Sequence, residues 1–431
     1  MRRLLLLLAI VLSAPAGAED SRMVRIAGGT YVRPLEKNGS TREVAPFLID
    51  VRQVTNAEFL AFVTAHPEWR RSQVKRLHAD ASYLRHWSGD TELGPQTPPD
   101  APVIHVSWFA ARAFLKAAGK RLPTTDEWEF AARADERQAD ASGEVAFRKR
   151  ILEWYARPAP QRLPAAKSMP SNYHGIRGMH GLVWEWTLDF VASMAGGESR
   201  ADGSPDSGQF CGAAGVDPNQ AIEYADFMRT AFRSSLQGDF CLAGLGFRGA
   251  RDSLPGATAP AGDAPASGAS LYELKATWAN QLGKPVEWSA SAGKFRVVAL
   301  GYATCKGVCP RIIADMQRIE KELDEVARQK LRFTFVTLDP IHDTVAEMKA
   351  LGERHKVDAA RWDLLTGEED AVLELAVALG IRYNRLPNGI DFAHSYLIAV
   401  IGPDGTLLHR WTDSRQGPEA AIQAIQKAGA R

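Results

Sequence analysis

The feature that most constrains the fold is a segment made almost wholly of alanine, proline, glycine and serine. It spans residues 253–270 and reads LPGATAPAGDAPASGAS from Leu254 onward. Such a composition has few side chains to bury and is typical of a semi-extended linker. The chain of 431 residues is long enough to form two or three domains. We therefore expect two folding units, residues 19–252 and 271–431, on either side of this linker.

The first residues have the pattern of an export signal. Arg2 and Arg3 precede the apolar residues 4–12, and the small residues SAPAGA follow. The apolar run is shorter than the roughly 20 residues that a membrane-spanning helix needs, and a basic start with a small-residue end is typical of a secretory signal. We expect a signal peptide at residues 1–18 and a mature protein in the periplasm. An uncleaved membrane anchor is the alternative.

Composition narrows the classes of partner. Lys and Arg number 52 and Asp and Glu number 51, which gives a formal charge of +1. A balanced charge gives no reason to expect a nucleic acid or an anionic membrane as the main partner. The four cysteines are too few for a disulfide framework, so their positions carry more information than their number.

The N-terminal unit is rich in glycine, tryptophan and turn residues and has few long periodic runs. Apolar residues at helical spacing predict helices over 57–64 and 108–118, each preceded by a residue that can cap it. A third helix begins at Thr124, where Glu127 completes a capping box. The rest of the unit has no strong periodicity, so we expect an irregular α+β fold.

The C-terminal unit alternates strands and helices. A continuous apolar run at 295–300 and an alternating pattern at 331–338 predict strands, helical periodicity follows each of them, and a Gly-Pro-Asp-Gly turn joins two final strands. Strand, helix, strand, helix and then a hairpin is a thioredoxin-like α/β order. The expected strands are 295–300, 331–338, 395–401 and 406–411, and the later helices are 345–355 and 371–379.

Cys305 and Cys309 lie where the strand at 295–300 meets the next helix. If both lie in the first helical turn, their Cα atoms are about 6 Å apart, which allows a disulfide or lets two thiolates hold one metal ion. The helix N-terminus lowers thiol pKa values and makes thiolates available. The pair is therefore a metal site or a redox dithiol. A structural disulfide is less favoured because so short a loop adds little closure entropy.

His394 is the candidate third ligand, because it begins the strand predicted at 395–401 and strand ends beside an active loop often carry functional residues. Thiolates favour Cu(I), and an added imidazole makes Cu(II) tolerable. A lone histidine before a strand is more often structural, so the residue pattern leaves both roles open.

The C-terminal unit resembles the Sco (SenC) family of copper-binding assembly factors. The resemblance rests on GYATCKGVCP, TLDPIHDT, WDLLTG and AHSYLIAVIGPDG, which occur in the family's order. It implies that Cys305, Cys309 and His394 bind copper, as Cu(I) or Cu(II), and that Asp339 lies near the site in a second shell. Thr304 precedes Cys305 in YATC, where many members have an FT-x-C sequence, which leaves the ligands unaffected. The same two cysteines also suit a thiol–disulfide oxidoreductase.

The N-terminal unit resembles the formylglycine-generating enzyme (sulfatase-modifying factor) superfamily, whose irregular fold is related to C-type lectin domains. The segments that carry the resemblance are MVRIAGGTYV, FLIDVRQVTNAEFLAFV, the stretch from PVIHVSW to RLPTTDEWEFAAR, GMHGLVWEW and LGFRGARD. The family's enzymes oxidise a substrate cysteine with copper held by two cysteines late in the domain.

In this chain the expected position of those cysteines, within residues 223–236, reads EYADFMRTAFRSSL and contains no cysteine. We therefore expect a non-catalytic domain that docks a client. The alternative is an active oxygen-dependent cysteine-modifying enzyme that uses Cys211 or Cys241 in an unusual site. Otherwise these two residues form a disulfide, or remain free or ligand thiols.

The resemblance also implies a calcium site in GMHGLVWEW. The carbonyls of Gly181 and Val183 and the carboxylate of Glu185 match ligands there, and Ca²⁺ prefers such oxygen donors. However, Gly178 stands where the family has Asn or Asp, and Leu182 replaces a common Asn. The alternative is that the segment belongs to the hydrophobic core.

Together these features predict an exported copper metallochaperone whose client is a periplasmic copper enzyme. Residues 221–236 are similar to NirV-type proteins of denitrification gene clusters, so the client is either the CuA site of an oxidase or a denitrification enzyme. A copper carrier tethered to a docking domain acts on its client at high effective concentration.

Overall fold

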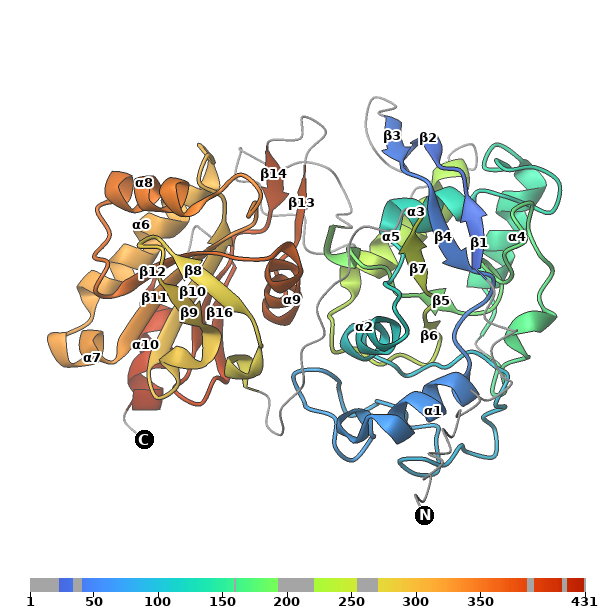
Figure 1. The fold of residues 1–431 in the computed structure, drawn as a ribbon, viewed down its shortest axis with the longest axis horizontal. Helices are drawn as coiled ribbons and strands as arrows, with labels where there is room; N and C mark the ends of the chain where they lie inside the picture. Colours follow the sequence, from blue (N-terminus) through green and yellow to red (C-terminus); the bar gives the residue numbers. More distant parts are fainter. Residues whose placement is uncertain are drawn as a thin grey trace, which may run out of the picture.

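The computed structural model describes residues 23–33, 41–158, 160–192, 221–253, 270–385, 391–412 and 417–429. Figure 1 shows two bodies, an N-terminal unit and a C-terminal unit. The predicted signal peptide and all but the ends of the predicted linker lie outside the described residues. Within these ranges, every helix is too short or too polar to cross a membrane.

The N-terminal unit has short strands in three small sheets, joined by long irregular segments. Its strands are β1 (Met23–Ile26), β2 (Gly29–Val32), β3 (Thr41–Val44), β4 (Phe47–Asp50), β5 (Trp184–Glu185), β6 (Leu245–Gly246) and β7 (Ala250–Asp252). They pair in the orders β1-β4-β7, β2-β3 and β5-β6. Its helices are α1 (Asn56–Ala65), α2 (Trp108–Ala117), α3 (Thr125–Ala132), α4 (Val145–Tyr155) and α5 (Ala221–Ser235), with 3-10 turns η2 (Pro67–Trp69), η3 (Ala166–Ser168) and η4 (Phe190–Ala192). The predicted irregular α+β class is confirmed.

The three predicted helices of this unit begin at their predicted caps. Thr55 caps α1 and Thr124 caps α3, and each forms a capping box with the glutamate three residues later. Ser107 caps α2 by accepting from the amide of Ala110. A cap satisfies amides that the first helical turn leaves unpaired. Because few residue types can do so, the start of such a helix can be predicted from the sequence. Helices α4 and α5 were not predicted.

The C-terminal unit is built on a seven-stranded sheet in the order β16-β15-β10-β11-β12-β8-β9. The strands are β8 (Thr277–Asn280), β9 (Pro285–Glu287), β10 (Phe295–Gly301), β11 (Leu331–Thr337), β12 (Trp362–Thr366), β15 (Ile398–Ile401) and β16 (Leu407–Trp411). The helices are α6 (Val308–Glu322), α7 (Glu325–Gln329), α8 (Val345–His355), α9 (Glu369–Leu379) and α10 (Glu419–Gly429), with 3-10 turns η6 (Leu271–Glu273) and η7 (Trp288–Ser291). A separate two-stranded sheet pairs β13 (Tyr383–Arg385) with β14 (Phe392–His394). The predicted α/β class is confirmed.

Strand β10 lies in the interior of this sheet, between β15 and β11, and all seven of its residues are buried. It pairs in parallel with β11, which in turn pairs in parallel with β12. Parallel strands of this kind are covered on both faces, which explains why nearly all of their residues are buried. Helices α6 and α8 contact each other, and α6 also contacts α10. Figure 1 shows α9, β13 and β14 on the side that faces the N-terminal unit.

The two units are in direct contact through helix α9 and the 3-10 turn η6 of the C-terminal unit. Val377 of α9 is buried in the hydrophobic core of the N-terminal unit. Arg112 of α2 forms ion pairs with Asp370 and Glu374 at 2.7 and 3.3 Å. Lys75 and Glu273, both largely buried, form another ion pair at 3.1 Å. An apolar residue and charged pairs therefore both hold the boundary.

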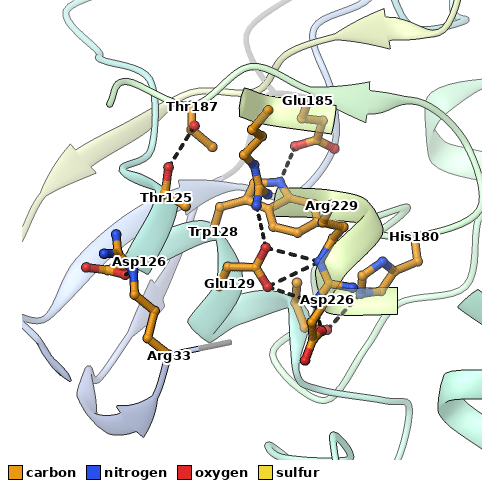
Figure 2. Close-up of polar contacts among 12 residues, drawn as sticks. Arg33, Thr125, Asp126, Trp128, Glu129, His180, Glu185, Thr187, Asp226 and Arg229 are labelled. Carbon is orange, nitrogen blue, oxygen red and sulfur yellow. Dashed lines mark hydrogen bonds and ion pairs between the residues drawn. The ribbon is translucent and has the colours of Figure 1, made fainter. Parts of the chain in front are cut away.

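A buried ion cluster joins α3 to α5 in the N-terminal unit (Figure 2). The carboxylate of Glu129 accepts hydrogen bonds from Arg229 at 2.9 and 3.0 Å and from Arg233 at 2.5 Å. Arg229 also contacts Asp226 and the hydroxyl of Tyr155. Burial opposes the charged form of Glu129, but the two guanidinium groups outweigh it and hold the pKa of Glu129 well below its usual range. The cluster therefore remains ionised at neutral pH.

We expect Glu129→Ala to lower the free energy of unfolding of the N-terminal unit by about 3–5 kcal/mol, because two buried guanidinium groups lose their main counter-charge. Denaturant titration followed by tryptophan fluorescence measures the change. Glu153→Ala is the matched control, since Glu153 is an exposed helical glutamate with only loose ion pairs at 4.0 Å, and it is expected to change stability by less than about 1 kcal/mol. Equal stability of the two variants would contradict the conclusion that Glu129 is the main counter-charge of the buried cluster.

Candidate metal centre

The loop after β10 positions the two cysteines differently. Cys309 lies in the first turn of α6, and its side chain is buried. Cys305 precedes the helix and is partly exposed, so the two cysteines do not share the first helical turn. At Gly301 a Cβ atom would stand 2.6 Å from the Cys309 sulfur. A glycine is therefore required where β10 ends, because any side chain there would displace Cys309.

His394 comes from a different element. It is the last residue of β14 and pairs with Tyr383 of β13, whereas the sequence predicted that it begins the strand that became β15. Its Nε2 atom lies 3.3 Å from the sulfur of Cys309, and its Nδ1 atom lies 3.2 Å from the carbonyl oxygen of Ser395. Since a carbonyl only accepts, Nδ1 carries the proton. The Nε2 lone pair then faces the sulfur, which is the orientation of a metal-binding histidine.

The structure brings the three predicted ligand residues together. One ligand atom each from Cys305, Cys309 and His394 lies within 4.8 Å of the other two. Within the part of the chain that the structure describes, no other group of three or more His, Cys, Asp or Glu residues converges in this way. Two sulfurs and one imidazole are a soft donor set that fits copper better than a hard cation such as Mg²⁺ or Ca²⁺. The residues present therefore fit the predicted metal.

The two thiols differ in acidity. A hydrogen bond from Cys309 lowers the pKa of the Cys305 thiol, and backbone contacts with Cys309 and Gly307 add to the effect. The same interaction with Cys305, together with burial, raises the pKa of Cys309. In the metal-free protein Cys305 is therefore the nucleophilic sulfur, and Cys309 holds the proton.

Two aspartates of the segment TLDPIHDT support the site from β11. Asp343 accepts from the backbone amide of Ala303 at 2.8 Å and from Thr337, which fixes the chain just before Cys305. Sequence reasoning missed this residue, although it is the second acid of the same motif. Asp339 contacts Arg385 at 2.8 Å and His342 at 2.9 Å. It is thus linked to β13 through Arg385, and no direct contact with the sulfurs is described.

The residues predicted to bind calcium lie in the interior of the N-terminal unit. The Glu185 carboxylate accepts two hydrogen bonds from Arg248 at 2.7 Å, one from the indole of Trp128 at 2.9 Å and one from a buried glutamine amide at 2.7 Å. Figure 2 shows Glu185 next to Trp128. Gly181 and Val183 precede it, and Gly181 adopts a positive φ of 94°. A cation at Glu185 would have to replace Arg248, and the calcium site remains a prediction.

Cys241 is a buried thiol that donates to the carbonyl of Asp239 at 3.3 Å. Burial raises the pKa of Cys241, so it is not a reactive thiolate at neutral pH. Cys211 lies outside the described residues, and the predicted Cys211–Cys241 disulfide therefore stays a prediction. The cysteine-free segment 223–236 lies almost wholly within α5.

Comparison with known proteins finds two family matches in the chain. Residues 11–253 match the family model of the sulfatase-modifying factor enzyme 1-like domain, and residues 267–429 match that of SCO1/SenC. The formylglycine-generating enzyme of Streptomyces coelicolor is 34% identical over 254 residues, which cover 49% of this chain and 80% of that protein. The inactive C-alpha-formylglycine-generating enzyme 2 of Mus musculus is 27% identical over 225 residues, which cover 39% of this chain and 69% of that protein.

The structure of ScoI from Bradyrhizobium japonicum with copper bound is similar to the C-terminal unit. It is 22% identical, covers 36% of this chain and 96% of its own, and has a TM-score of 0.32. The sequence match of residues 11–253 extends over more than half of the chain. The protein therefore belongs to the sulfatase-modifying factor enzyme 1-like family and carries a SCO1/SenC domain at its C-terminal end.

Proposed function

We propose that the protein is an exported copper metallochaperone that binds one copper ion through Cys305, Cys309 and His394. The observation that carries the proposal is the convergence of these three ligand atoms within 4.8 Å in a SCO1/SenC domain. Two thiolates neutralise the charge of the ion, and the imidazole adds a donor that also supports Cu(II). The protonated Nδ1 of His394 already orients this ring for binding.

The exposure of the three ligands suits transfer of the ion. Cys309 is buried, whereas Cys305 and His394 are partly exposed. A client's ligand can therefore approach the ion from the side of Cys305 and His394 while Cys309 still holds it. Exchange of one ligand at a time avoids release of a free ion, which is what a carrier requires.

A thiol–disulfide oxidoreductase is the second candidate function, and the unequal acidity of the two thiols favours it. The Cys305 thiolate would attack a client disulfide and form a mixed disulfide, from which the Cys309 sulfur would release the client's second thiol. The client gains two electrons, and this protein is left with a Cys305–Cys309 disulfide that an external thiol reductant must reduce. This chemistry does not need His394, which is why copper transfer is our first proposal.

We further propose that the N-terminal unit docks the client and does not catalyse cysteine oxidation. Support comes from the cysteine-free segment 223–236 and from the buried, weakly acidic thiol of Cys241. The client would be a periplasmic copper enzyme, either an oxidase with a CuA site or an enzyme of denitrification. The signal-like residues 1–18 support a periplasmic location.

Copper titration of the reduced protein tests the site. We expect Cys305→Ser and Cys309→Ser each to abolish stoichiometric Cu(I) binding, measured by competition with a chromophoric chelator. His394→Ala is expected to weaken binding by more than about tenfold, since loss of even a supporting residue costs about 10- to 100-fold in metal affinity. The same variant should exchange disulfides with a model substrate at the wild-type rate, because both thiols remain.

His342→Ala is the matched control for the histidine. Its ring is 63% exposed and contacts Asp339 rather than the cysteines, so copper affinity should stay at the wild-type value. If His394→Ala binds copper as tightly as the wild type, the ligand assignment is wrong. Wild-type disulfide exchange without any copper binding would instead favour the oxidoreductase.

The absence of catalysis in the N-terminal unit is tested with a peptide that carries the cysteine motif of sulfatases. Incubated with the copper-loaded full-length protein and oxygen, the peptide should keep its mass, because the predicted catalytic cysteines are missing. A loss of mass that corresponds to conversion of the cysteine to an aldehyde, seen by mass spectrometry, would overturn this part of the proposal. The formylglycine-generating enzyme of Streptomyces coelicolor serves as the positive control.

A further inference from the structure

Arg382 crosses the boundary between the two units. It immediately precedes β13, and its guanidinium group donates to the backbone carbonyls of Phe190, Arg233 and Leu236 in the N-terminal unit. The distances to the first two oxygens are 3.4 Å each. The group also lies 5.4 Å from the centre of the Phe190 ring, within the range of a cation–π interaction.

The chemistry of this contact is that of a helix cap supplied by another domain. Arg233 lies in the last turn of α5, and Leu236 directly follows the helix. The last carbonyls of a helix lack hydrogen-bond donors within it and carry partial negative charge. The positively charged guanidinium group of Arg382 supplies such donors. Burial of Arg382 disfavours its charge and lowers its pKa to about 10. Since this pKa is still well above 7, Arg382 remains charged at neutral pH and can donate to these carbonyls.

The backbone of the same residue holds the strand that carries the third ligand. The amide of Arg382 donates to the hydroxyl of Ser395 at 3.1 Å, and the amide of Ser395 donates to the carbonyl of Arg382 at 2.8 Å. The next residue along, Tyr383, pairs with His394. The carbonyl of Ser395 in turn accepts from the Nδ1 of His394. Short contacts thus connect the end of α5 to the imidazole.

The hairpin of β13 and β14 depends on such anchors. It forms a two-stranded sheet of its own and is not hydrogen-bonded to the seven-stranded sheet. Two strands alone are at best marginally stable, so contacts outside the hairpin fix its position. Arg385 provides one anchor through Asp339, on the side of β11. Phe392 packs in the core of the C-terminal unit and provides another. Arg382 adds a contact that belongs to the N-terminal unit.

We propose that Arg382 is a positioning residue through which the N-terminal unit holds His394 in place to bind copper. This inference rests on the proposed copper site and adds that its affinity depends on a contact outside the SCO1/SenC domain. The coupling is reciprocal: copper binding stabilises the boundary between the units, and a client that displaces the end of α5 weakens the His394 ligand. Docking on the N-terminal unit would then favour release of the ion.

The test is the Cu(I) affinity of the full-length protein with Arg382→Met, which keeps the apolar stem and removes the donors. We expect affinity to fall about 10- to 100-fold, the usual cost of losing a supporting contact behind a metal ligand. Arg382→Lys should lie between this variant and the wild type. In a His394→Ala background, Arg382→Met should have no further effect, because the ligand that it positions is already gone.

Arg112→Ala is the matched control. It removes ion pairs with Asp370 and Glu374 at the same boundary, but these lie on α9 and not on the hairpin. It should leave copper affinity unchanged. Wild-type affinity in Arg382→Met would overturn the inference, and so would an equal loss in Arg112→Ala or a further loss in the His394→Ala background.

Amide hydrogen exchange of the metal-free protein separates this inference from the proposed function. Arg382→Met should increase exchange at the amide of Ser395, whereas Arg112→Ala should not, and circular dichroism verifies that both variants fold. If the wild type fails to bind copper, the proposed function falls, while unchanged exchange at Ser395 would refute the positioning role independently. If the wild type binds copper and only the affinity of Arg382→Met is unchanged, the positioning role alone falls.

Discussion

The parallel pairing of β10 with β11 is the constraint on which the C-terminal unit depends. The two strands are in register from Phe295 with Leu331 to Gly301 with Thr337, so their carboxyl ends reach the same edge of the sheet. Ligand sites of open α/β sheets form at such an edge. The loop that carries Cys305 and the segment that carries Asp339 and Asp343 therefore lie side by side as a direct result of this pairing. The third ligand alone has to be brought from elsewhere.

His394, the third ligand of the proposed site, lies next to a residue that contacts the other unit. His394 lies on a hairpin that forms a sheet of its own. Phe392 packs this hairpin onto the core of the C-terminal unit, Arg385 links it to Asp339, and Arg382 links it to the N-terminal unit. In the proposed site the imidazole and the two sulfurs come from different elements, so one ligand can leave while two sulfurs remain. This combination gives a physical basis for both retention and transfer of a metal ion.

The sequence predicted the elements whose signals are local. The caps at Thr55, Ser107 and Thr124 and the bounds of α8 agree with the structure, because a cap or an amphipathic stripe is determined within one or two turns. The condition that both cysteines lie in the first helical turn does not hold, because α6 begins only at Val308.

The interactions that the sequence left hidden are those between distant segments. The strand expected from Ser395 begins only at Ile398, as β15, while His394 ends the separate strand β14, which pairs with β13 rather than with β10. Arg382 gave no signal at all, because a guanidinium group that caps a helix of another unit has no spacing or motif. Asp343 lay within a recognised segment, yet its bond to the amide of Ala303 depends on how two loops meet.

Helix α5 links the core of the N-terminal unit to the boundary between the two units. The segment in which the family resemblance places catalytic cysteines contributes Arg229 and Arg233 to the buried cluster around Glu129 (Figure 2). The end of the same helix offers its carbonyls to Arg382. One face of α5 thus contacts the core of its own unit, and the C-terminal end of the helix contacts the neighbouring unit. Both sets of contacts require that α5 stay in a fixed position. The proposed positioning of His394 through Arg382 requires the same.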